Sequence, residues 1–427
     1  MPQTEPHVVI VGGGFGGITA AEQLTKANVR LTIIDRSNHH LFQPLLYQVA
    51  TAALSPGDIA IPIRAVLGKR PNMKILMGEV TSVDKNEQSL RLADGRSINF
   101  DKLILAPGAQ YNYFGNDDWE EHAPGLKSIS DALQIRERIL CSLEEAEQLD
   151  DRKLRKPYLT YVIIGGGPTG VEMAGAIAEI AKRNMMRDYS NFNKNETRIF
   201  LIEAGPKILN GYPESLSQKA RKALENMGVN VLLNTPVTDI GEAKVTFKED
   251  SIETPNIIWA AGVAASPLLS SLETEQDKTG RINVRDNLSI PGNPNIFVIG
   301  DAMHLKQDGE PLPALAPVAL QQGKYVAKII QSGTADSKPF HYTDKGTMAT
   351  IGRAKAVADI KGFKFSGFFA WLLWGVVHIL FLIGFRNRFR VFVEWMWFYF
   401  TFKRGVRLIT NRWSEDENKT AEVKDKQ

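Results

Sequence analysis

The sequence predicts an α/β fold with two Rossmann-like dinucleotide-binding domains and a C-terminal amphipathic helical region. Three observations lead to this prediction. They are a glycine-rich turn between a buried strand and a helix, a second copy of that pattern about 150 residues later, and a change to apolar, aromatic and basic residues after residue 363. The chain has 427 residues, of which 43% are hydrophobic and 23% are charged, so it is long enough for two or three globular domains.

The first nucleotide-binding unit begins close to the N-terminus. Residues 8–11 read Val-Val-Ile-Val, a run apolar enough for a buried parallel strand. It leads directly into Gly12-Gly13-Gly14-Phe15-Gly16-Gly17, and an Ala-rich helix is expected from Ile18 to Leu24. A second strand is expected over residues 30–34 and ends at Asp35. Together these elements form a βαβ unit.

The second unit repeats this order. A strand is expected over residues 161–164, followed by Gly165-Gly166-Gly167-Pro168-Thr169-Gly170 and a helix from Val171 to Ala181. The next strand, residues 198–202, ends at Glu203. A lone glycine motif is a weak signal, but here each copy follows a strand, opens a helix and is followed by a carboxylate at the end of the next strand.

The three fingerprint glycines of each unit have separate mechanical roles. The first permits the tight turn, the second lets the backbone approach a pyrophosphate, and the third allows close packing of helix and strand. We therefore expect two dinucleotide sites; the alternative is that one copy is a degenerate duplicate that packs but binds nothing. The glycines are Gly12, Gly14 and Gly17 in the first unit, and Gly165, Gly167 and Gly170 in the second.

Asp35 and Glu203 stand where a carboxylate would accept hydrogen bonds from a ribose diol. A carboxylate at this place repels a 2′-phosphate, so Glu203 favours NADH over NADPH. The alternative for Glu203 is a carboxylate at a strand end that meets only solvent.

Three further segments have local patterns. Residues 130–149 carry mixed charges and predict a solvated helix, and the alternating residues 231–247 predict antiparallel strands. Pro291, Gly292 and Pro294 mark a turn before an apolar strand over residues 296–299.

Cys141 is the one cysteine of the chain, and this excludes several kinds of redox site. The chain alone cannot form an intrachain disulfide, a dithiol pair, a Cys-based zinc site or an iron–sulfur cluster. The seven His are scattered with no His-Glu-x-x-His motif, so no metal site is expected. Any electron chemistry must then belong to a bound cofactor. The first residues suggest neither a signal peptide nor a transit peptide.

The C-terminal region is basic and strongly apolar. Residues 353–412 carry a net charge of +9, which leaves −6 for the rest of the chain. Residues 365–385 contain no charged side chain, and basic and aromatic residues follow them. This composition suits an anionic membrane surface better than a nucleic acid. We expect one or two helices that lie in one leaflet; a membrane-spanning helix and a dimer-interface helix are the alternatives.

Three short motifs accompany the glycine turns: Ile104-Leu105-Ala106-Pro107-Gly108, Trp259-Ala260-Ala261-Gly262 and Ile299-Gly300-Asp301-Ala302. With the two units they resemble the two-dinucleotide-binding flavoprotein family, whose architecture is glutathione-reductase-like. In that family the first unit binds FAD, the second binds NAD(P)H, and a Gly-Asp pair places its Asp on FAD. The resemblance covers residues 8 to about 330 and implies that Asp301 binds FAD. Members that reduce disulfides or oxidise sulfide need cysteines that this chain lacks.

Three longer segments carry a closer resemblance: His40-Leu41-Phe42-Gln43-Pro44-Leu45-Leu46-Tyr47-Gln48-Val49-Ala50, Gly170-Val171-Glu172-Met173-Ala174-Gly175 and residues 363–410. They resemble type II NADH dehydrogenases, the single-subunit, non-proton-pumping NADH:quinone oxidoreductases of respiratory membranes. The resemblance implies FAD-dependent oxidation of NADH with two-electron reduction of a membrane quinone, either ubiquinone or menaquinone. Two alternatives stay open: electron transfer to a soluble ferredoxin-like protein, and a nucleotide-sensing protein without turnover.

The same resemblance implies catalytic roles for three residues. Glu172 would link nicotinamide, flavin and the proton uptake of the quinone, or else make only a structural hydrogen bond. Gln321 and Gln322, on a helix that runs to Ile330, would bind the quinone, or else only flavin or backbone. His39 and His40 are expected in a loop and are given no catalytic role.

A larger set of residues is implied to bind the cofactors. It consists of Gly12, Gly14, Phe15, Gly16, Gly17, Asp35, Arg36, Gln48, Val80, Ala106, Gly108, Asp301, Ala319, Gly165, Gly167, Thr169, Gly170, Glu203, Ala261 and Gly262.

We expect a split FAD-binding domain, an NADH-binding domain and a membrane-association region. The expected partners are NADH, a quinone, the surface of a lipid bilayer and a second copy of the chain, but no nucleic acid. The expected location is the cytoplasmic side of the cell inner membrane, as a peripheral or monotopic protein. The domain boundaries are 1–115 with 281–330, 116–280 and 331–427.

Overall fold

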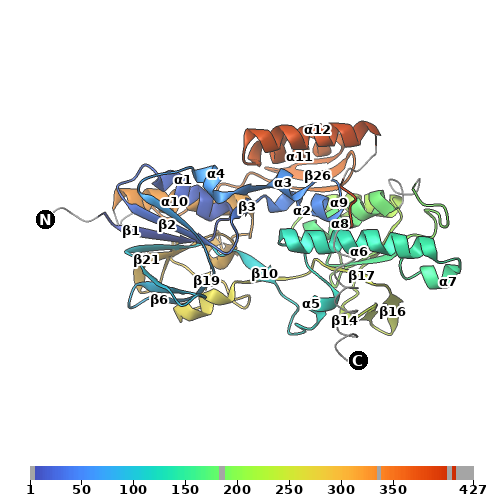
Figure 1. Ribbon diagram of the computed structural model, residues 1–427, viewed down its shortest axis with the longest axis horizontal. Helices are drawn as coiled ribbons and strands as arrows, with labels where there is room; N and C mark the ends of the chain where they lie inside the picture. Colours follow the sequence, from blue (N-terminus) through green and yellow to red (C-terminus); the bar gives the residue numbers. More distant parts are fainter. Residues whose placement is uncertain (1–4, 182–187, 334–337, 402–405, 410–427) are drawn as a thin grey trace, which may run out of the picture. The chain divides into compact units, whose positions relative to one another are not determined.

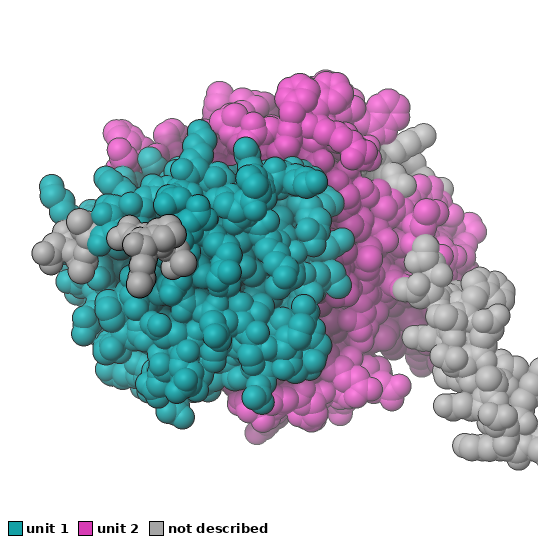
Figure 2. Space-filling view, turned by 60° about the vertical axis from the view of Figure 1, so that its left-hand side comes forward, with its two compact units in different colours: residues 1–41, 60–112, 263–345 teal, residues 42–59, 113–262, 346–427 magenta. Residues whose placement is uncertain are grey.

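A computed structural model describes residues 5–181, 188–333, 338–401 and 406–409 of the chain. The chain forms two compact units, coloured teal and magenta in Figure 2. Their boundaries differ from the predicted domains, because residues 42–59 and the C-terminal region belong with the second glycine turn. The assignment of domains to FAD, NADH and membrane stays a prediction. Unit 1 comprises residues 1–41, 60–112 and 263–345, and unit 2 comprises residues 42–59, 113–262 and 346–427.

The core of unit 1 is a six-stranded sheet in the order β20-β21-β9-β1-β2-β5 (Figure 1). All its pairings are parallel except that of β20 with β21. Every residue of β1 is buried, as its apolar run predicts. The strands are β1 (His7–Val11), β2 (Arg30–Asp35), β5 (Met73–Met77), β9 (Lys102–Leu105), β20 (Ser289–Ile290) and β21 (Asn293–Val298).

Two helices of unit 1 meet through glycines. They are α1 (Phe15–Leu24) and α10 (Ala316–Ser332). A Cβ atom at Gly323 would lie 2.4 Å from the carbonyl oxygen of Gly16, closer than any side chain allows. The two helices can therefore approach this closely only because residue 323 is glycine.

Unit 2 contains a four-stranded parallel sheet in the order β13-β12-β11-β17. This order matches β5-β2-β1-β9 of unit 1, so the duplication extends beyond the glycine turns to the whole sheet. The strands are β11 (Thr160–Ile164), β12 (Arg198–Ile202), β13 (Val229–Leu232) and β17 (Asn256–Trp259). The accompanying helices are α6 (Ile129–Gln148), α8 (Pro168–Glu179) and α9 (Glu214–Asn226).

Two local predictions are corrected here. Helix α6 is not simply solvated: residues such as Ile135, Ile139 and Leu143 are buried, and its mixed charges occupy only the other face. Val231 lies in β13, a parallel strand, so the alternation that starts there does not mark antiparallel pairing. The antiparallel strands begin only at Val237.

Each unit also contains an antiparallel meander. In unit 1 it consists of β6 (Val80–Asp84), β7 (Ser89–Leu92) and β8 (Ser97–Asn99). In unit 2 it consists of β14 (Val237–Gly241), β15 (Lys244–Phe247) and β16 (Asp250–Glu253).

The C-terminal part of unit 2 is a three-stranded antiparallel sheet followed by two helices that lie side by side (Figure 1). The predicted apolar segment does not form one helix, since residues 382–384 separate α11 from α12 and Gly384 has a φ of +86°. In the described part of the chain, no helix has both the length and the apolar character needed to cross a membrane. The elements are β25 (Thr347–Gly352), β26 (Lys355–Ile360), β27 (Phe363–Gly367), α11 (Phe368–Phe381) and α12 (Phe385–Thr401).

Short elements complete the fold. The helices are η1 (Gln43–Leu45), α2 (Leu46–Ala50), α3 (Pro56–Ile59), α4 (Ile63–Leu67), α5 (Trp119–His122), α7 (Arg152–Arg155), η3 (Pro267–Leu272) and η4 (Gly300–Ala302). The strands are β3 (His39–Leu41), β4 (Ala60–Pro62), β10 (Ala109–Tyr111), β18 (Val263–Ala265), β19 (Ile282–Asn283), β22 (Met303–His304), β23 (Lys306–Gln307) and β24 (Glu310–Pro311).

Candidate functional site

The glycine turn of unit 1 has the geometry that its sequence predicts. Gly12 has a φ of +102°, and a Cβ atom there would lie 2.1 Å from the carbonyl oxygen of Ala106. A Cβ atom at Gly17 would lie 1.9 Å from the carbonyl oxygen of Gly12. Any other residue at these two positions would therefore push the strand, the turn and the helix apart.

Unit 2 repeats this geometry closely. Gly165 has a φ of +108°, and its Cβ atom would lie 2.7 Å from the carbonyl oxygen of Ala260. A Cβ atom at Gly170 would lie 1.8 Å from the carbonyl oxygen of Gly165. Both units therefore have the complete backbone geometry of the glycine turn.

The second glycine of each turn faces open space. A Cβ atom at Gly14 or at Gly167 would meet nothing within 4 Å. These residues immediately precede α1 and α8, whose first N–H groups lack partners within the helix. A pyrophosphate fits such a place, because backbone donors and the helix dipole both favour an anion there. The residues present therefore suit one dinucleotide in each unit.

The two carboxylates do more than the sequence suggests. Asp35 accepts hydrogen bonds from the N–H groups of Gly13 at 2.5 Å and Ser37 at 2.6 Å. Glu203 accepts hydrogen bonds from the N–H groups of Gly166 and Gly205, both at 2.6 Å. Each carboxylate thus holds its glycine turn in place and keeps further lone pairs for a ribose diol.

His40 is a residue whose contribution the sequence did not reveal. It lies in strand β3, not in a loop, and it is 1% exposed. Its Nδ1 lies 2.9 Å from the carbonyl oxygen of Gly13, which can only accept, so Nδ1 carries the proton. The ring meets Phe15 edge to face at 5.2 Å, and burial lowers the pKa of His40. No local pattern could indicate this contact, since it joins the turn to a distant strand.

The two glutamines of α10 differ in their surroundings. Gln322 is fully buried; its Oε1 accepts the N–H of Gly300 at 2.7 Å, and its Nε2 has no partner in the described part of the chain. Gln321 is more exposed and exchanges two hydrogen bonds of 3.0 Å with the backbone of Thr343. A buried amide nitrogen without a partner is costly, so Gln322 is suited to donate to a bound ligand.

Glu172 lies in the first turns of α8, where burial raises its pKa to about 8. The backbone N–H of Thr350 donates to its carboxyl, which lowers the pKa but does not outweigh the loss of solvation. Burial raises the pKa of the Tyr212 hydroxyl, the nearby Glu172 charge raises it further, and a hydrogen bond with the Thr347 side chain partly offsets both effects. A carboxyl of this kind is largely protonated at pH 7.

Gln48 connects the segment 42–59 to the C-terminal helices. Its Oε1 accepts the indole N–H of Trp395 in α12 at 2.7 Å, and its Nε2 donates to the hydroxyl of Tyr47 at 2.8 Å. The Trp395 ring also stacks on Trp374 of α11. Close by, Arg390 of α12 forms an ion pair of 3.3 Å with the buried Asp58.

The other predicted residues are placed as follows. Residues predicted to bind cofactors that lie in unit 1 are Phe15, Gly16, Arg36, Val80, Ala106, Gly108, Asp301 and Ala319, while Thr169, Ala261 and Gly262 lie in unit 2. Their contacts with a cofactor stay predictions.

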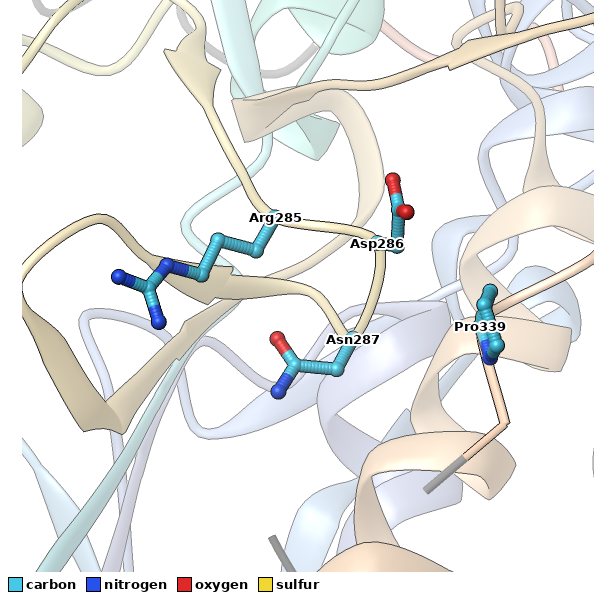
Figure 3. A pocket seen from close by; sticks show the side chains of 4 residues that line it. All are labelled: Arg285, Asp286, Asn287 and Pro339. Carbon is cyan, nitrogen blue, oxygen red and sulfur yellow. The ribbon is translucent and has the colours of Figure 1, made fainter. Parts of the chain in front are cut away.

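An open surface hollow of about 450 Å³ lies elsewhere on unit 1 (Figure 3). Arg285, Asp286, Asn287 and Pro339 line it, and the side chains of Arg285 and Asn287 point away from Pro339. None of these residues belongs to the predicted sites.

Comparisons with known proteins agree with this arrangement. The pyridine nucleotide-disulphide oxidoreductase family matches residues 6–323, and the NDH2 C-terminal domain matches residues 345–404. The chain is 42% identical to the type II NADH:quinone oxidoreductase Ndh of Mycobacterium tuberculosis, over 96% of this chain and 93% of that protein. It is 30% identical to the internal alternative NAD(P)H-ubiquinone oxidoreductase A1 of Arabidopsis thaliana, over 92% of this chain and 84% of that protein.

A solved structure shares the fold. NDH2 from Plasmodium falciparum in complex with NADH superposes with a TM-score of 0.86 at 22% identity, over 94% of this chain and 99% of that one. With the duplicated nucleotide folds, the matched families and the 42% identity taken together, the chain belongs to the type II NADH:quinone oxidoreductases of the pyridine nucleotide-disulphide oxidoreductase family.

Proposed function

We propose that this chain oxidises NADH and reduces a membrane quinone through FAD, without pumping protons. Family membership supports this activity. The main structural support is that one chain contains two complete glycine turns, each with open space at its second glycine for a pyrophosphate. The reaction converts NADH, a proton and quinone into NAD⁺ and quinol. Because Cys141 is the one cysteine, no dithiol pair within the chain can relay the electrons.

The glycine turn of unit 1 would hold FAD and that of unit 2 would hold NADH. When bound, FAD supplies a hydride acceptor that afterwards releases two electrons to the quinone. The protein binds and orients the nucleotides: Asp35 and Glu203 fix the two turns and would accept the ribose hydroxyls. Glu203 also favours NADH, because its charge repels a 2′-phosphate.

Gln322 would donate its buried N–H to the flavin or to the quinone. Its Oε1 is already held by Gly300, so the orientation of the amide is fixed before a ligand arrives. Gln321 keeps one N–H beyond its bonds to Thr343, and this N–H could serve the quinone.

Glu172 would supply a proton for quinol formation. Its pKa of about 8 keeps a proton on the carboxyl at pH 7, and the proton is lost as the pH rises through 8. We expect Glu172→Gln to lower quinone-dependent turnover by about 10²-fold. NADH oxidation by a soluble acceptor that needs no proton should change much less.

The apolar surface of α11 and α12 supports docking on a lipid bilayer. Large side chains are exposed along both helices, including Phe369 at 76%, Phe385 at 84% and Phe400 at 71%. Neighbouring exposed apolar side chains of this kind mark interaction surfaces. We place the protein on the cytoplasmic face of the inner membrane, as a homodimer that uses ubiquinone or menaquinone.

An absorption spectrum tests the activity directly. NADH should bleach the flavin absorbance of the purified protein, and a quinone in lipid vesicles should restore it. A colourless protein that cannot take up FAD would refute the proposal. Restoration by a soluble ferredoxin but not by quinones would replace the proposed acceptor.

A further inference from the structure

The edge strand β25 of the C-terminal sheet lies directly against helix α8. The contact is very close at its centre: a Cβ atom at Gly175 would lie 1.6 Å from the carbonyl oxygen of Ile351. Only glycine permits this approach of strand backbone to helix. An edge strand exposes unpaired N–H groups, which must find other partners when they are buried.

Two carboxylates of α8 supply these partners. The N–H of Thr350 donates to Glu172, and the N–H of Arg353 donates to Glu179 at 2.5 Å. Glu172 and Glu179 are seven residues apart, so they lie on one face of the helix on either side of Gly175. The strand is thus held at two points, and the close contact lies between them.

The same region is linked to the C-terminal helix α12. The guanidinium group of Arg353 lies over the ring of Tyr399 in α12, 4.2 Å from its centre. The turn after β25 is therefore fixed by Glu179 through its backbone and by Tyr399 through its side chain. Both contacts lie within unit 2.

We infer that Glu179 and Gly175 are positioning residues for Glu172: they seat β25 on α8 so that the N–H of Thr350 fixes the Glu172 carboxyl. The inference rests on the proposed role of Glu172 for its importance in the reaction. It also gives the C-terminal domain a second task besides lipid contact, because that domain completes the surroundings of a residue in the nucleotide-binding unit.

The electrostatics are consistent with this arrangement. The Thr350 N–H stabilises the charged carboxylate and so opposes the effect of burial on the Glu172 pKa. Tyr212 is a titratable group that interacts electrostatically with Glu172, and Thr347 of β25 hydrogen-bonds its hydroxyl. If β25 withdraws, Glu172 loses its donor but also gains water, and its pKa falls toward the ordinary range because burial is the larger of the two effects.

Two variants of the full-length, FAD-loaded chain distinguish the hydrogen-bond acceptor of the Glu179 side chain from its negative charge. Glu179→Ala removes both, whereas Glu179→Gln removes the charge and keeps an oxygen that can accept the Arg353 N–H. Hydrogen exchange of the amides at 350 and 353 should accelerate at least about tenfold in E179A and less than about twofold in E179Q.

A second readout follows Glu172 itself. Infrared spectroscopy of the carboxyl, assigned with E172Q, should give a lower titration midpoint in E179A than in E179Q, because an unseated β25 leaves Glu172 less buried. Equal amide exchange and equal midpoints in the two variants would overturn the inference. If E179A does not fold, Glu179→Asp can replace it, because this change withdraws the carboxylate by one methylene. Exchange of the amides at 350 and 353 should then accelerate about threefold. Exchange as slow as in E179Q would contradict the inference.

These outcomes are independent of the proposed function. If E172Q retains full quinone turnover, the proton-donor role of Glu172 fails, whatever the amides show. If E172Q loses turnover while E179A and E179Q behave alike, the proposed function stands and the positioning role fails.

Discussion

The two nucleotide folds of this chain are built with nearly the same hydrogen bonds. The first glycine N–H donates to the carbonyl at the end of the next strand over 2.8 Å in both, from Gly12 to Ile34 and from Gly165 to Ile202. A second hydrogen bond is also the same in both units. The N–H of the alanine after the neighbouring strand donates over 2.8 Å, from Ala106 to the carbonyl of Val11 and from Ala260 to that of Ile164. Asp35 and Glu203 each then hold the middle glycine of the turn.

The folds differ at the carbonyl of that middle glycine. In unit 2 the carbonyl of Gly166 accepts the backbone N–H of Leu209 at 2.7 Å. In unit 1 the carbonyl of Gly13 lies 2.9 Å from the buried imidazole of His40. One turn is thus held entirely by backbone and carboxylate, and the other also by a side chain that can titrate. The same fold can therefore differ in its response to pH.

The largest effects are expected from substitution of the third glycine in each turn. Gly17→Ala should reduce the FAD content of the purified protein at least about tenfold, because the added Cβ atom collides with the Gly12 carbonyl. Gly170→Ala should leave FAD bound and raise the KM for NADH at least about tenfold. Absorption spectra and NADH titrations measure both effects. If G170A loses FAD and G17A keeps it, the nucleotides are assigned to the wrong units.

A charge change tests which carboxylate selects the nicotinamide nucleotide. Glu203→Gln should raise kcat/KM for NADPH relative to NADH about tenfold, since it removes the repulsion of a 2′-phosphate. The matched change in unit 1, Asp35→Asn, should leave this ratio unaltered and weaken FAD retention. Steady-state kinetics with NADH and NADPH measure the ratio of the two kcat/KM values in each variant. A ratio that moves in D35N, and not in E203Q, would contradict the comparison.

Replacement of His40 tests the difference between the two turns. His40→Phe should weaken FAD binding about fivefold at pH 7, because the Gly13 carbonyl loses its donor. His40→Gln keeps an N–H donor and serves as the control.

The pH response has a defined sign. Burial lowers the pKa of His40 below its ordinary value near 6.5, so the unfolded chain takes up a proton that the folded chain resists. Stability from the neutral imidazole is present above pH 6.5 and is lost as the pH falls below it. His40→Gln should therefore reduce the drop in Tm between pH 7 and pH 5; an unchanged drop would show that His40 does not titrate in this range. His7, whose pKa burial also lowers, should account for part of the remaining drop.

The smallest effect is expected at the second glycines. Gly14→Ala and Gly167→Ala add a methyl group to open space, so the Tm of each variant, measured without FAD and without NADH, should stay within about 2 °C of the unmodified chain under the same conditions. Each substitution should nevertheless weaken the binding of the nucleotide in its own unit, because the methyl group occupies the place of a pyrophosphate. A large fall in Tm would show that this space belongs to the protein.

The sequence predicted the elements that depend on local residue order. The strands beside both glycine turns, the turns themselves and the break before β21 are found close to the expected residues. They are predictable because apolar runs and positive-φ glycines act within a few residues. The meander β6–β8 was missed, and Val231 was assigned to the wrong kind of pairing, because strand partners are chosen across long stretches of chain.

The candidate site was predictable in part for the same reason. Gly12, Gly17, Gly165 and Gly170 follow from a spacing that geometry demands. The surroundings of Gln322 and Glu172 do not, because the first depends on Gly300 and the second on Thr350. The segment over residues 365–385 was correctly identified as apolar, but its first residues lie in strand β27, and the break between α11 and α12 depends on a turn at Gly384.

The order of residues by itself determined that this chain has two nucleotide folds, one cysteine and an apolar C-terminal region. Each of these properties is either a count or a pattern of residues that lie close together in the chain. Only the tertiary structure decided that His40 supports Gly13, that β25 packs on α8 and that Trp395 holds Gln48. Those contacts join residues distant in the chain, and they form because burial leaves each polar group with that partner in reach.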